Sequence, residues 1–200
     1  LTNHSSGRMG YAIARAAADR GAEVTLVSGP VELKKPAFVQ TVDVVTADEM
    51  FQAVTARAGE QDIMIKAAAV ADYRPAQVAK SKIKKAAGED GGRDLQLALE
   101  RTEDILLWLG QHKRPGQLLC GFSMETENLL ENSRKKLERK NLDLIAANSL
   151  TQDGAGFGVS TNILTLISRE GEEQLPLMSK EEAAHRLLDR LVDIRRQKRG

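Results

Sequence analysis

The sequence has few of the residues that mark specialised classes of protein. Its 200 residues include a single cysteine, Cys120, and only 4% of them are aromatic. One cysteine cannot form an intrachain disulfide, which favours a reducing compartment such as the cytoplasm. No apolar run is long enough to span a bilayer, and no secretory signal segment is recognisable. These absences exclude a disulfide-stabilised secreted domain and favour a cytoplasmic globular protein.

Neither sign of charge is in excess. The chain has 29 Lys and Arg against 28 Asp and Glu, a formal net charge of +1. Balanced charge and scarce aromatic residues do not favour a general nucleic-acid binder or a polybasic membrane binder. Apolar residues at 42% and charged residues at 28% are ordinary values for a folded domain. The length predicts one domain over residues 1–200, large enough to bury a sizeable core.

Segments with helical and strand-like hydrophobic patterns alternate along the chain. This order predicts an α/β fold, Rossmann-like and doubly wound, with a mainly parallel sheet flanked by helices. A turn at residues 169–172 predicts a β-hairpin extension near the C-terminus. Ser179 with Glu182 has the spacing of a helix-capping box. The expected strands are 23–28, 41–45, 62–70, 95–99, 118–121, 142–147, 161–168 and 173–177, and the expected helices are 10–20, 47–58, 103–111, 126–140 and 180–196.

A short loop containing glycines precedes the first expected helix, in the stretch NHSSGRMG at residues 3–10. Free backbone amides and the positive end of the helix dipole make such a loop a site for anions, usually phosphate. Ser5 and Ser6 add hydroxyl donors, and Gly7 and Gly10 allow close approach of a ligand or of backbone. The other interpretation is a helix start with small residues for packing.

The stretch AAAVADYRP at residues 67–75 follows an expected central strand. Ligands of open α/β sheets bind at the carboxyl ends of the strands. Alanines leave room for a flat base or a phosphate beside the backbone, and Asp72 can accept hydrogen bonds from a ligand. A buried strand end with a capping aspartate is the alternative.

Lysines occur in two further places where they can neutralise an anion. Residues 80–85 contain four lysines, which form either a solvated surface or a cationic flap over a polyphosphate. Lys136 and Lys140 lie four residues apart on one expected helix and therefore share a face.

Motifs of metal sites and catalytic triads are missing. The histidines His4, His112 and His185 are scattered, and the sequence contains neither C-x-x-C nor H-E-x-x-H. Cys120 lies in an expected buried strand, where core packing is the favoured role.

A nicotinamide-dependent reductase is one alternative function for a Rossmann-like chain. The first loop has the spacing G-x-x-G, and no acidic residue ends the strand 23–28. Short-chain dehydrogenases pair a catalytic tyrosine with a lysine four positions later. Here Tyr11 is followed at that offset by Arg15, and Tyr73 by Gln77. A second alternative is a non-catalytic nucleotide-binding module that uses the lysine-rich segment.

Taken together, several segments closely resemble the phosphopantothenoylcysteine synthetase family, the C-terminal half of bacterial bifunctional coenzyme A biosynthesis flavoproteins. The matching segments occur in order over nearly the whole chain. They are Thr2–Gly10, Val24–Pro30, Ala68–Pro75, Lys82–Lys85, Gly121–Phe122 and Arg139–Asn148.

The resemblance implies a CTP-dependent ligase. In this family the carboxylate of 4′-phosphopantothenate attacks the α-phosphate of CTP, forming an acyl-cytidylate and pyrophosphate. The amine of L-cysteine then displaces CMP and gives 4′-phosphopantothenoylcysteine. Mg²⁺ accompanies the nucleotide, although its ligands are not identified, and no FMN is expected in this half. A homodimer is implied, with residues 161–177 as a candidate part of the contact and a decarboxylase half in the full-length protein.

The resemblance also implies site residues. Asn3 matches an asparagine that handles the acyl-cytidylate, and Lys82 belongs to a flap over the triphosphate; these two are the expected catalytic residues. Phosphopantothenate is expected at Asn3, Ser5, Ser6, Gly7 and Ala69. The CTP-binding residues are expected to be Ala68, Ala69, Asp72, Lys82, Asp104, Ile105, Phe122, Lys136 and Lys140.

Two departures from the family pattern affect this picture. Residues 101–105 are RTEDI, where the family usually has K-N-P-D-I. The family also has a first strand, a Gly-Pro-Thr loop and an arginine before the position of Leu1. A strand upstream of the first residue is therefore expected.

Overall fold

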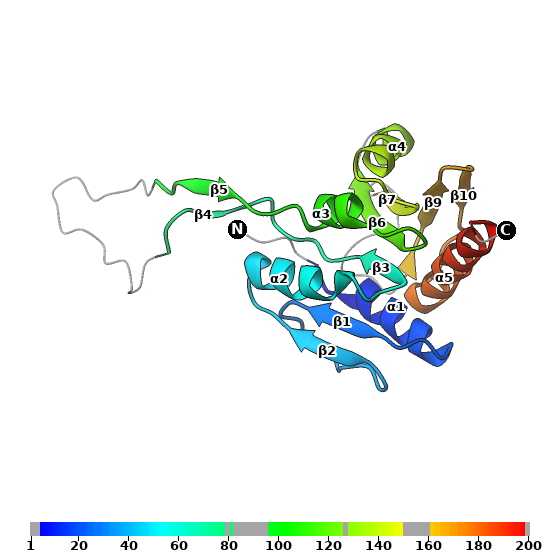
Figure 1. Cartoon of the computed structure of the whole chain (residues 1–200), viewed down its shortest axis with the longest axis horizontal. Coiled ribbons are helices and arrows are strands. Elements are labelled where there is room, and N and C mark those ends of the chain that lie inside the picture. The colour runs from blue at the N-terminus through cyan, green and yellow to red at the C-terminus, as the bar shows by residue number, and fades with distance from the viewer. Residues whose placement is uncertain (1–4, 79–80, 82–95, 126–127, 150–160, 199–200) are drawn as a thin grey trace.

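The computed structural model describes residues 5–78, 81, 96–125, 128–149 and 161–198 (Figure 1). Its helices are α1 (Arg8–Asp19), α2 (Ala47–Ala58), α3 (Ile105–His112), α4 (Leu129–Arg139) and α5 (Lys180–Gln197). Its strands are β1 (Thr25–Ser28), β2 (Gln40–Asp43), β3 (Ile63–Lys66), β4 (Tyr73–Pro75), β5 (Leu99–Arg101), β6 (Leu118–Glu125), β7 (Leu144–Ser149), β8 (Thr161–Asn162), β9 (Leu164–Ser168), β10 (Glu172–Gln174) and β11 (Met178–Ser179).

A five-stranded sheet forms the centre of the protein, in the order β10-β9-β7-β6-β3. Strands β3, β6 and β7 are parallel to one another, whereas β9 and β10 are antiparallel to their neighbours. The predicted α/β architecture with a mainly parallel sheet and a C-terminal hairpin is confirmed.

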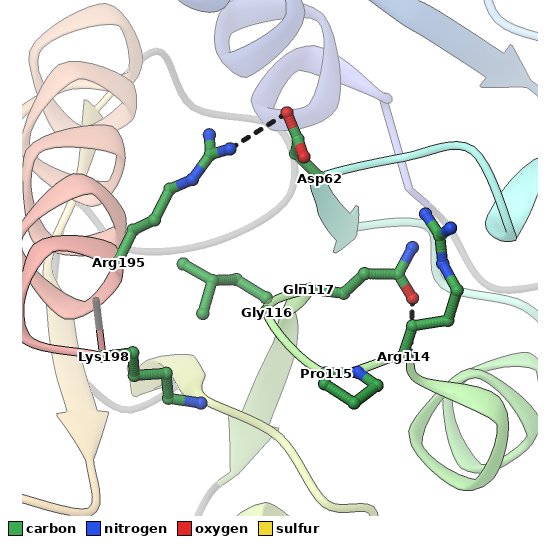
Figure 2. Close-up of a pocket in the computed structure, with 8 residues that line it drawn as sticks. Asp62, Arg114, Pro115, Gly116, Gln117, Arg195 and Lys198 are labelled. Carbon is green, nitrogen blue, oxygen red and sulfur yellow. Dashed lines mark hydrogen bonds and ion pairs between the residues drawn. The ribbon is translucent and has the colours of Figure 1, made fainter.

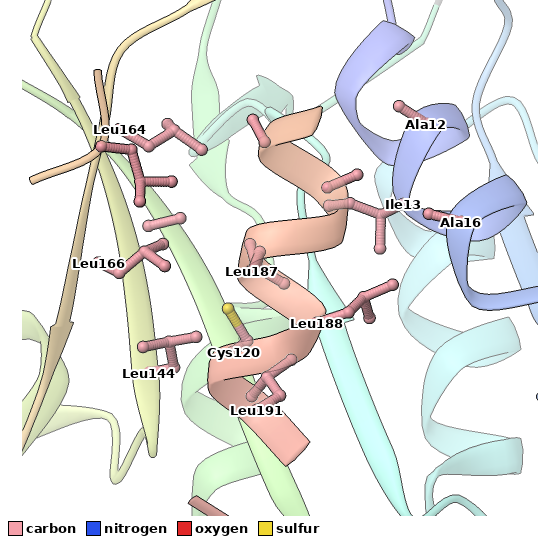
Figure 3. Close-up of a cluster of buried hydrophobic side chains, with 14 of the residues drawn as sticks. Ala12, Ile13, Ala16, Cys120, Leu144, Leu164, Leu166, Leu187, Leu188 and Leu191 are labelled. Carbon is pink, nitrogen blue, oxygen red and sulfur yellow. The ribbon is translucent and has the colours of Figure 1, made fainter. Parts of the chain in front are cut away.

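Alternating side chains of the sheet build a separate core on each face, since successive residues of a strand point to opposite sides. Leu118 and Cys120 of β6 pack with α1 and α5, whereas Leu119 packs with α2, α3 and α4. The first of these clusters is seen in Figure 3, where Leu187 and Leu191 of α5 lie over the sheet. Cys120 is completely buried there, which confirms its predicted core role.

Three smaller pairings surround the central sheet. Strands β1 and β2 are parallel and form a sheet of their own, and β8 pairs with β11. Strands β4 and β5 pair antiparallel in an arm that extends away from the body of the protein (Figure 1). The sequence predicted β5 four residues too early, because the alternation of leucines in LQLAL lies at residues 95–99, mostly before the strand. It did not predict β4, which has no such alternation.

Helix ends agree with the sequence where a polar cap is present. The Ser179 hydroxyl accepts from the Glu182 amide at 3.1 Å, and the Glu182 carboxylate accepts from the Ser179 amide at 2.9 Å. This confirms the predicted capping box of α5. Helix α4 was predicted from residue 126 but begins at Leu129, after Asn128 adopts a left-handed conformation with φ of +51°. Among the described residues, no helix is long and apolar enough to cross a bilayer.

A glycine lets α3 approach the end of α4 closely. A Cβ atom on Gly110 would lie 1.9 Å from the carbonyl oxygen of Lys140, an impossible distance. The Asn141 side-chain amide also donates to the Gly110 carbonyl at 2.9 Å. The absence of a side chain at Gly110 therefore decides where α3 lies relative to Lys140.

We expect Gly110→Ala to lower the free energy of unfolding by about 3 kcal/mol or more, the upper end of the usual cost of overpacking. The new methyl group would meet backbone, which cannot rotate away as a side chain can. Urea unfolding followed by circular dichroism measures the loss. Gly59→Ala is the matched control, because a Cβ there has no neighbour within 4 Å and φ is −61°. Equal stability of Gly110→Ala and the wild type would contradict the close approach.

Candidate functional site

The candidate site lies at the carboxyl edge of the parallel strands. Strand β3 ends at Lys66, whose register partner in β6 is Gly121. The strand was predicted to continue to residue 70, but residues 67–72 leave the ladder and form a loop along this edge. Such an edge is where open α/β sheets bind ligands.

The start of α1 forms one part of this edge. Gly7 occupies the N-cap position with φ of +71°, and its amide donates to Ser5 Oγ at 3.4 Å. A Cβ on Gly7 would lie 2.9 Å from Val31 Cγ1, so both conformation and space require glycine. Gly7 has no side chain that could cap α1, and the first turn of α1 contains no acidic residue. The positive end of the helix dipole is therefore available to an anion.

The alanine run lies directly beside this helix start. A Cβ on Gly10 would be 3.8 Å from the Cβ of Ala67, which is ordinary van der Waals contact. Ala68 and Asp72 are exposed, and Ala69 is half-buried. Two segments that the sequence marked separately, the glycine-containing loop and the alanine run, thus meet at one edge.

Thr102 connects the alanine run to the start of α3. Its hydroxyl donates to the Ala71 carbonyl at 2.6 Å, and its amide donates to the Asp72 carbonyl at 3.0 Å. Residues 101–105, where the sequence departs from the family pattern, are therefore held against the run by a side chain and by backbone.

Asp104 begins α3 and pairs with Lys140. Its Oδ1 accepts from the Leu107 amide at 3.0 Å, and its Oδ2 lies 2.7 Å from Lys140 Nζ. Burial raises the pKa of Asp104, but hydrogen bonds from Lys140 and Leu107 outweigh it and leave the pKa below its usual value. Ile105, expected at the CTP site, has its side chain in the core with 2% exposure. Only the Ile105 backbone can therefore face a ligand.

Lys136 reaches the same edge from α4. Its Nζ donates to the carbonyl oxygen of Phe122 in β6 at 2.9 Å. The Phe122 side chain is half-buried and packs against the core between the sheet and helices α1 and α5. Lys136 and Lys140 therefore share one helix face, as their spacing predicted, and Lys136 contacts β6 beside the point where β3 ends.

The structure adds Lys66, which the sequence analysis did not single out. Burial and the nearby charges of Lys136 and Lys140 lower the pKa of Lys66 to about 8, although Asp104 and Asp72 oppose the shift. The available signal was a lysine ending the otherwise apolar strand DIMIK. Two other expected residues, Asn3 and Lys82, lie outside the described residues.

A hollow of about 430 Å³ lies at the opposite edge of the sheet (Figure 2). Asp62, just before β3, and the turn before β6 contribute to its lining. Arg195 spans it to Asp62 at 3.1 Å. None of the expected site residues that the structure describes lines this hollow.

The comparisons with known proteins agree over almost the entire chain. Residues 1–194 match the family model described as DNA/pantothenate metabolism flavoprotein C-terminal domain. The chain is 49% identical over 192 residues to the Coenzyme A biosynthesis bifunctional protein CoaBC of Escherichia coli (strain K12), covering 96% of this chain and 47% of that protein. The chain thus spans about half the length of this relative.

Solved structures give the same result. A crystal structure of the C-terminal domain of Coenzyme A biosynthesis bifunctional protein CoaBC is 43% identical, with a TM-score of 0.78, covering 96% of this chain and 84% of that one. A Cab2 mutant in complex with phosphopantothenate-cysteine shares the fold, with a TM-score of 0.79 at 16% identity, covering 99% of this chain and 80% of that one. The match across residues 1–194 and the identity to CoaBC together show that the chain belongs to the DNA/pantothenate metabolism flavoprotein C-terminal domain family.

Proposed function

We propose that this domain joins 4′-phosphopantothenate to L-cysteine at the expense of CTP, giving 4′-phosphopantothenoylcysteine, CMP and pyrophosphate. The reaction belongs to coenzyme A biosynthesis, the role carried in the printed name of the CoaBC relatives. The domain would act in the cytoplasm, beside a decarboxylase half in the full-length protein.

The observation that carries the proposal is the meeting of two anion-binding arrangements at one sheet edge. The Gly10–Ala67 contact places the start of α1, with glycine at its N-cap, beside the alanine run. Thr102 then ties that run to the segment whose Asp104 binds Lys140. A phosphorylated substrate at α1 and a triphosphate beside Lys136 and Lys140 would be neighbours, as a reaction between them requires.

The chemistry explains why such a site needs no protein nucleophile. In the first step a carboxylate oxygen of phosphopantothenate bonds to the α-phosphorus of CTP, and the bond to the β-phosphate breaks to release pyrophosphate. In the second step the cysteine nitrogen bonds to the acyl carbon, CMP leaves with the oxygen, and the amine loses a proton. Lysines and backbone amides orient the reactants and neutralise phosphate charge.

Mg²⁺ would enter with CTP. The part of the chain that the structure describes contains no group of three or more His, Cys, Asp or Glu suited to holding a metal ion. Mg²⁺ in nucleotide sites is usually bound by substrate phosphates, water and one or two carboxylates. We therefore propose that the Mg²⁺ ion is bound chiefly by the phosphates of CTP.

The two half-reactions provide the direct test. We expect pyrophosphate release from CTP, Mg²⁺ and 4′-phosphopantothenate, and CMP release only after L-cysteine is added. Coupled pyrophosphate detection and chromatography of CMP measure the two products, with ATP as the control nucleotide. The assay is run with the domain and with the full-length protein. Failure of the full-length protein to release pyrophosphate from CTP would refute the proposal.

Lys136 tests the location of the nucleotide site. We expect Lys136→Met to lower kcat/KM for CTP roughly 10- to 100-fold, because hydrogen bonds to charged groups are worth about 1.5–3 kcal/mol. Steady-state kinetics at saturating phosphopantothenate and cysteine measure the loss. Lys135→Met is the matched control, since Lys135 is exposed on the same helix and paired with Glu131. If the two variants lowered kcat/KM equally, the nucleotide would not bind at the face of α4 that carries Lys136.

A homodimer is also proposed, with residues 161–177 as part of its contact. Strand β9 is largely buried beside β7, so the contact would use the outer strand β10 and the half-exposed Leu177. We expect Leu177→Asp to lower both the mass from light scattering and the ligase activity. A dimer of unchanged mass would exclude Leu177 from the contact.

A further inference from the structure

Lys66 occupies a position where a lysine is costly. It is the last residue of β3, directly before the alanine run, and its register partner is Gly121. Its neighbours in the strand, Met64 and Ile65, belong to the two cores or pack against them. Gly121 offers no side chain beside it, and Ala67 offers only a methyl group. A charged group is thus placed at the end of a half-buried strand with little polar cover.

The Lys66 ammonium group makes no hydrogen bond or ion pair with any of the residues that the structure describes. Lys136 lies close by, because its Nζ donates at 2.9 Å to the carbonyl of Phe122, the residue after the register partner of Lys66. The charges of Lys136 and Lys140 repel the charge of Lys66, whereas those of Asp104 at the start of α3 and Asp72 in the following loop attract it. Asp104 is already committed to Lys140 at 2.7 Å and to the Leu107 amide. Buried charges are ordinarily paired, so an unpaired lysine among like charges needs a functional reason.

We propose that Lys66 is a further cationic ligand for the phosphates of the nucleotide, beside Lys136 and Lys140, and that it takes up a proton when they bind. The inference rests on the proposed function and deepens it. Lys66 comes from the end of β3, Lys136 from α4 and Lys140 from its C-cap, and β6 connects them, since Gly121 pairs with Lys66 and the Phe122 carbonyl accepts from Lys136. A polyphosphate is the ligand chemistry that such a group of lysines recognises, because it supplies several negative oxygens within one short chain.

The proton uptake follows from the electrostatics of the free site. Burial and the other two lysines lower the pKa of Lys66 to about 8 in the free protein. A bound polyphosphate would replace this repulsion by attraction and raise the pKa again. If binding favours the charged form tenfold, the pKa rises by about one unit and about half a proton is taken up per nucleotide at pH 8.5.

Isothermal titration calorimetry of CTP with Mg²⁺ tests the inference. Titrations at pH 8.5 in two buffers of different ionisation enthalpy give the number of protons taken up. We expect about half a proton for the wild type and none for Lys66→Met. Lys66→Arg keeps a charge that does not titrate, so it should bind CTP within about threefold of the wild type without proton uptake. Lys135→Met, on the exposed side of α4, should behave as the wild type.

The pH dependence of affinity is the second measurement. We expect the wild type to bind CTP about tenfold more tightly than Lys66→Met at pH 7, and less than twofold more tightly at pH 9.5. The difference disappears because the wild-type lysine is then neutral in most molecules. A merely structural role would leave a difference that does not follow the titration of Lys66.

Thermal unfolding checks that Lys66→Met is folded. The pKa of Lys66 is lower in the folded protein than its ordinary value of 10.5. The folded chain therefore binds the proton less tightly than the unfolded chain, and the charge costs stability below pH 8. This cost declines as the pH rises toward 10.5. We expect Lys66→Met to have a higher Tm than the wild type at pH 7, with the gap closing at high pH.

The outcomes separate this inference from the proposed function. If the wild type does not bind CTP at all, the proposed function fails. If it binds CTP, but with unchanged affinity in Lys66→Met at pH 7 or without proton uptake at pH 8.5, the role of Lys66 is overturned and the ligase proposal stands. If Lys66→Met does not fold, the inference is still tested by the other two proteins. It requires that the wild type takes up a proton on binding CTP and that Lys66→Arg does not.

Discussion

The burial of strand β6 between β3 and β7 is the constraint on which the rest of the structure depends. Leu118, Leu119 and Cys120 are fully buried, and their alternation sends apolar groups into the cores on both faces of the sheet. Burying one leucine contributes roughly 1.5–3 kcal/mol, so a shifted register would be strongly unfavourable. Polar chemistry is therefore confined to the two ends of the parallel strands, and the amino and carboxyl edges become different environments.

Charged side chains at the amino and carboxyl edges of the sheet differ in their hydrogen-bond partners. At the amino edge, Asp143 is almost completely buried and accepts from Lys113 at 2.7 Å, from Lys198 and from the Leu119 amide. Burial opposes its ionisation, but these donors outweigh burial and lower its pKa. This network is closed and structural. At the carboxyl edge the Lys66 ammonium group has no such partner among the described residues, and we propose that its charge is kept for a ligand.

Sequence patterns predicted the parts of the fold that local physics decides. The capping box at Ser179 and the burial of Cys120 follow from neighbouring residues and were predicted correctly. Strand β4 and the end of β3 were not, because an exposed pairing and a departure from the ladder depend on segments far away in the chain. Likewise, the side chain of Ile105 is buried by α3 packing that no local pattern reports. Asp104 and Lys140 were both expected at the site, but their direct bond was not.

The sequence by itself determined the alternation of strands and helices, the capping box of α5 and the family, because these are recorded in the order and spacing of residues. Only the tertiary structure decided that the start of α1 touches the alanine run, that Thr102 holds the start of α3 against it, and that Gly110 brings α3 to Lys140. The electrostatic repulsion between Lys66 and Lys136, seventy residues later in the chain, likewise depends on the tertiary structure. The electrostatic environment of a side chain is set by distances through space, which emerge only when the strands are paired and the helices packed.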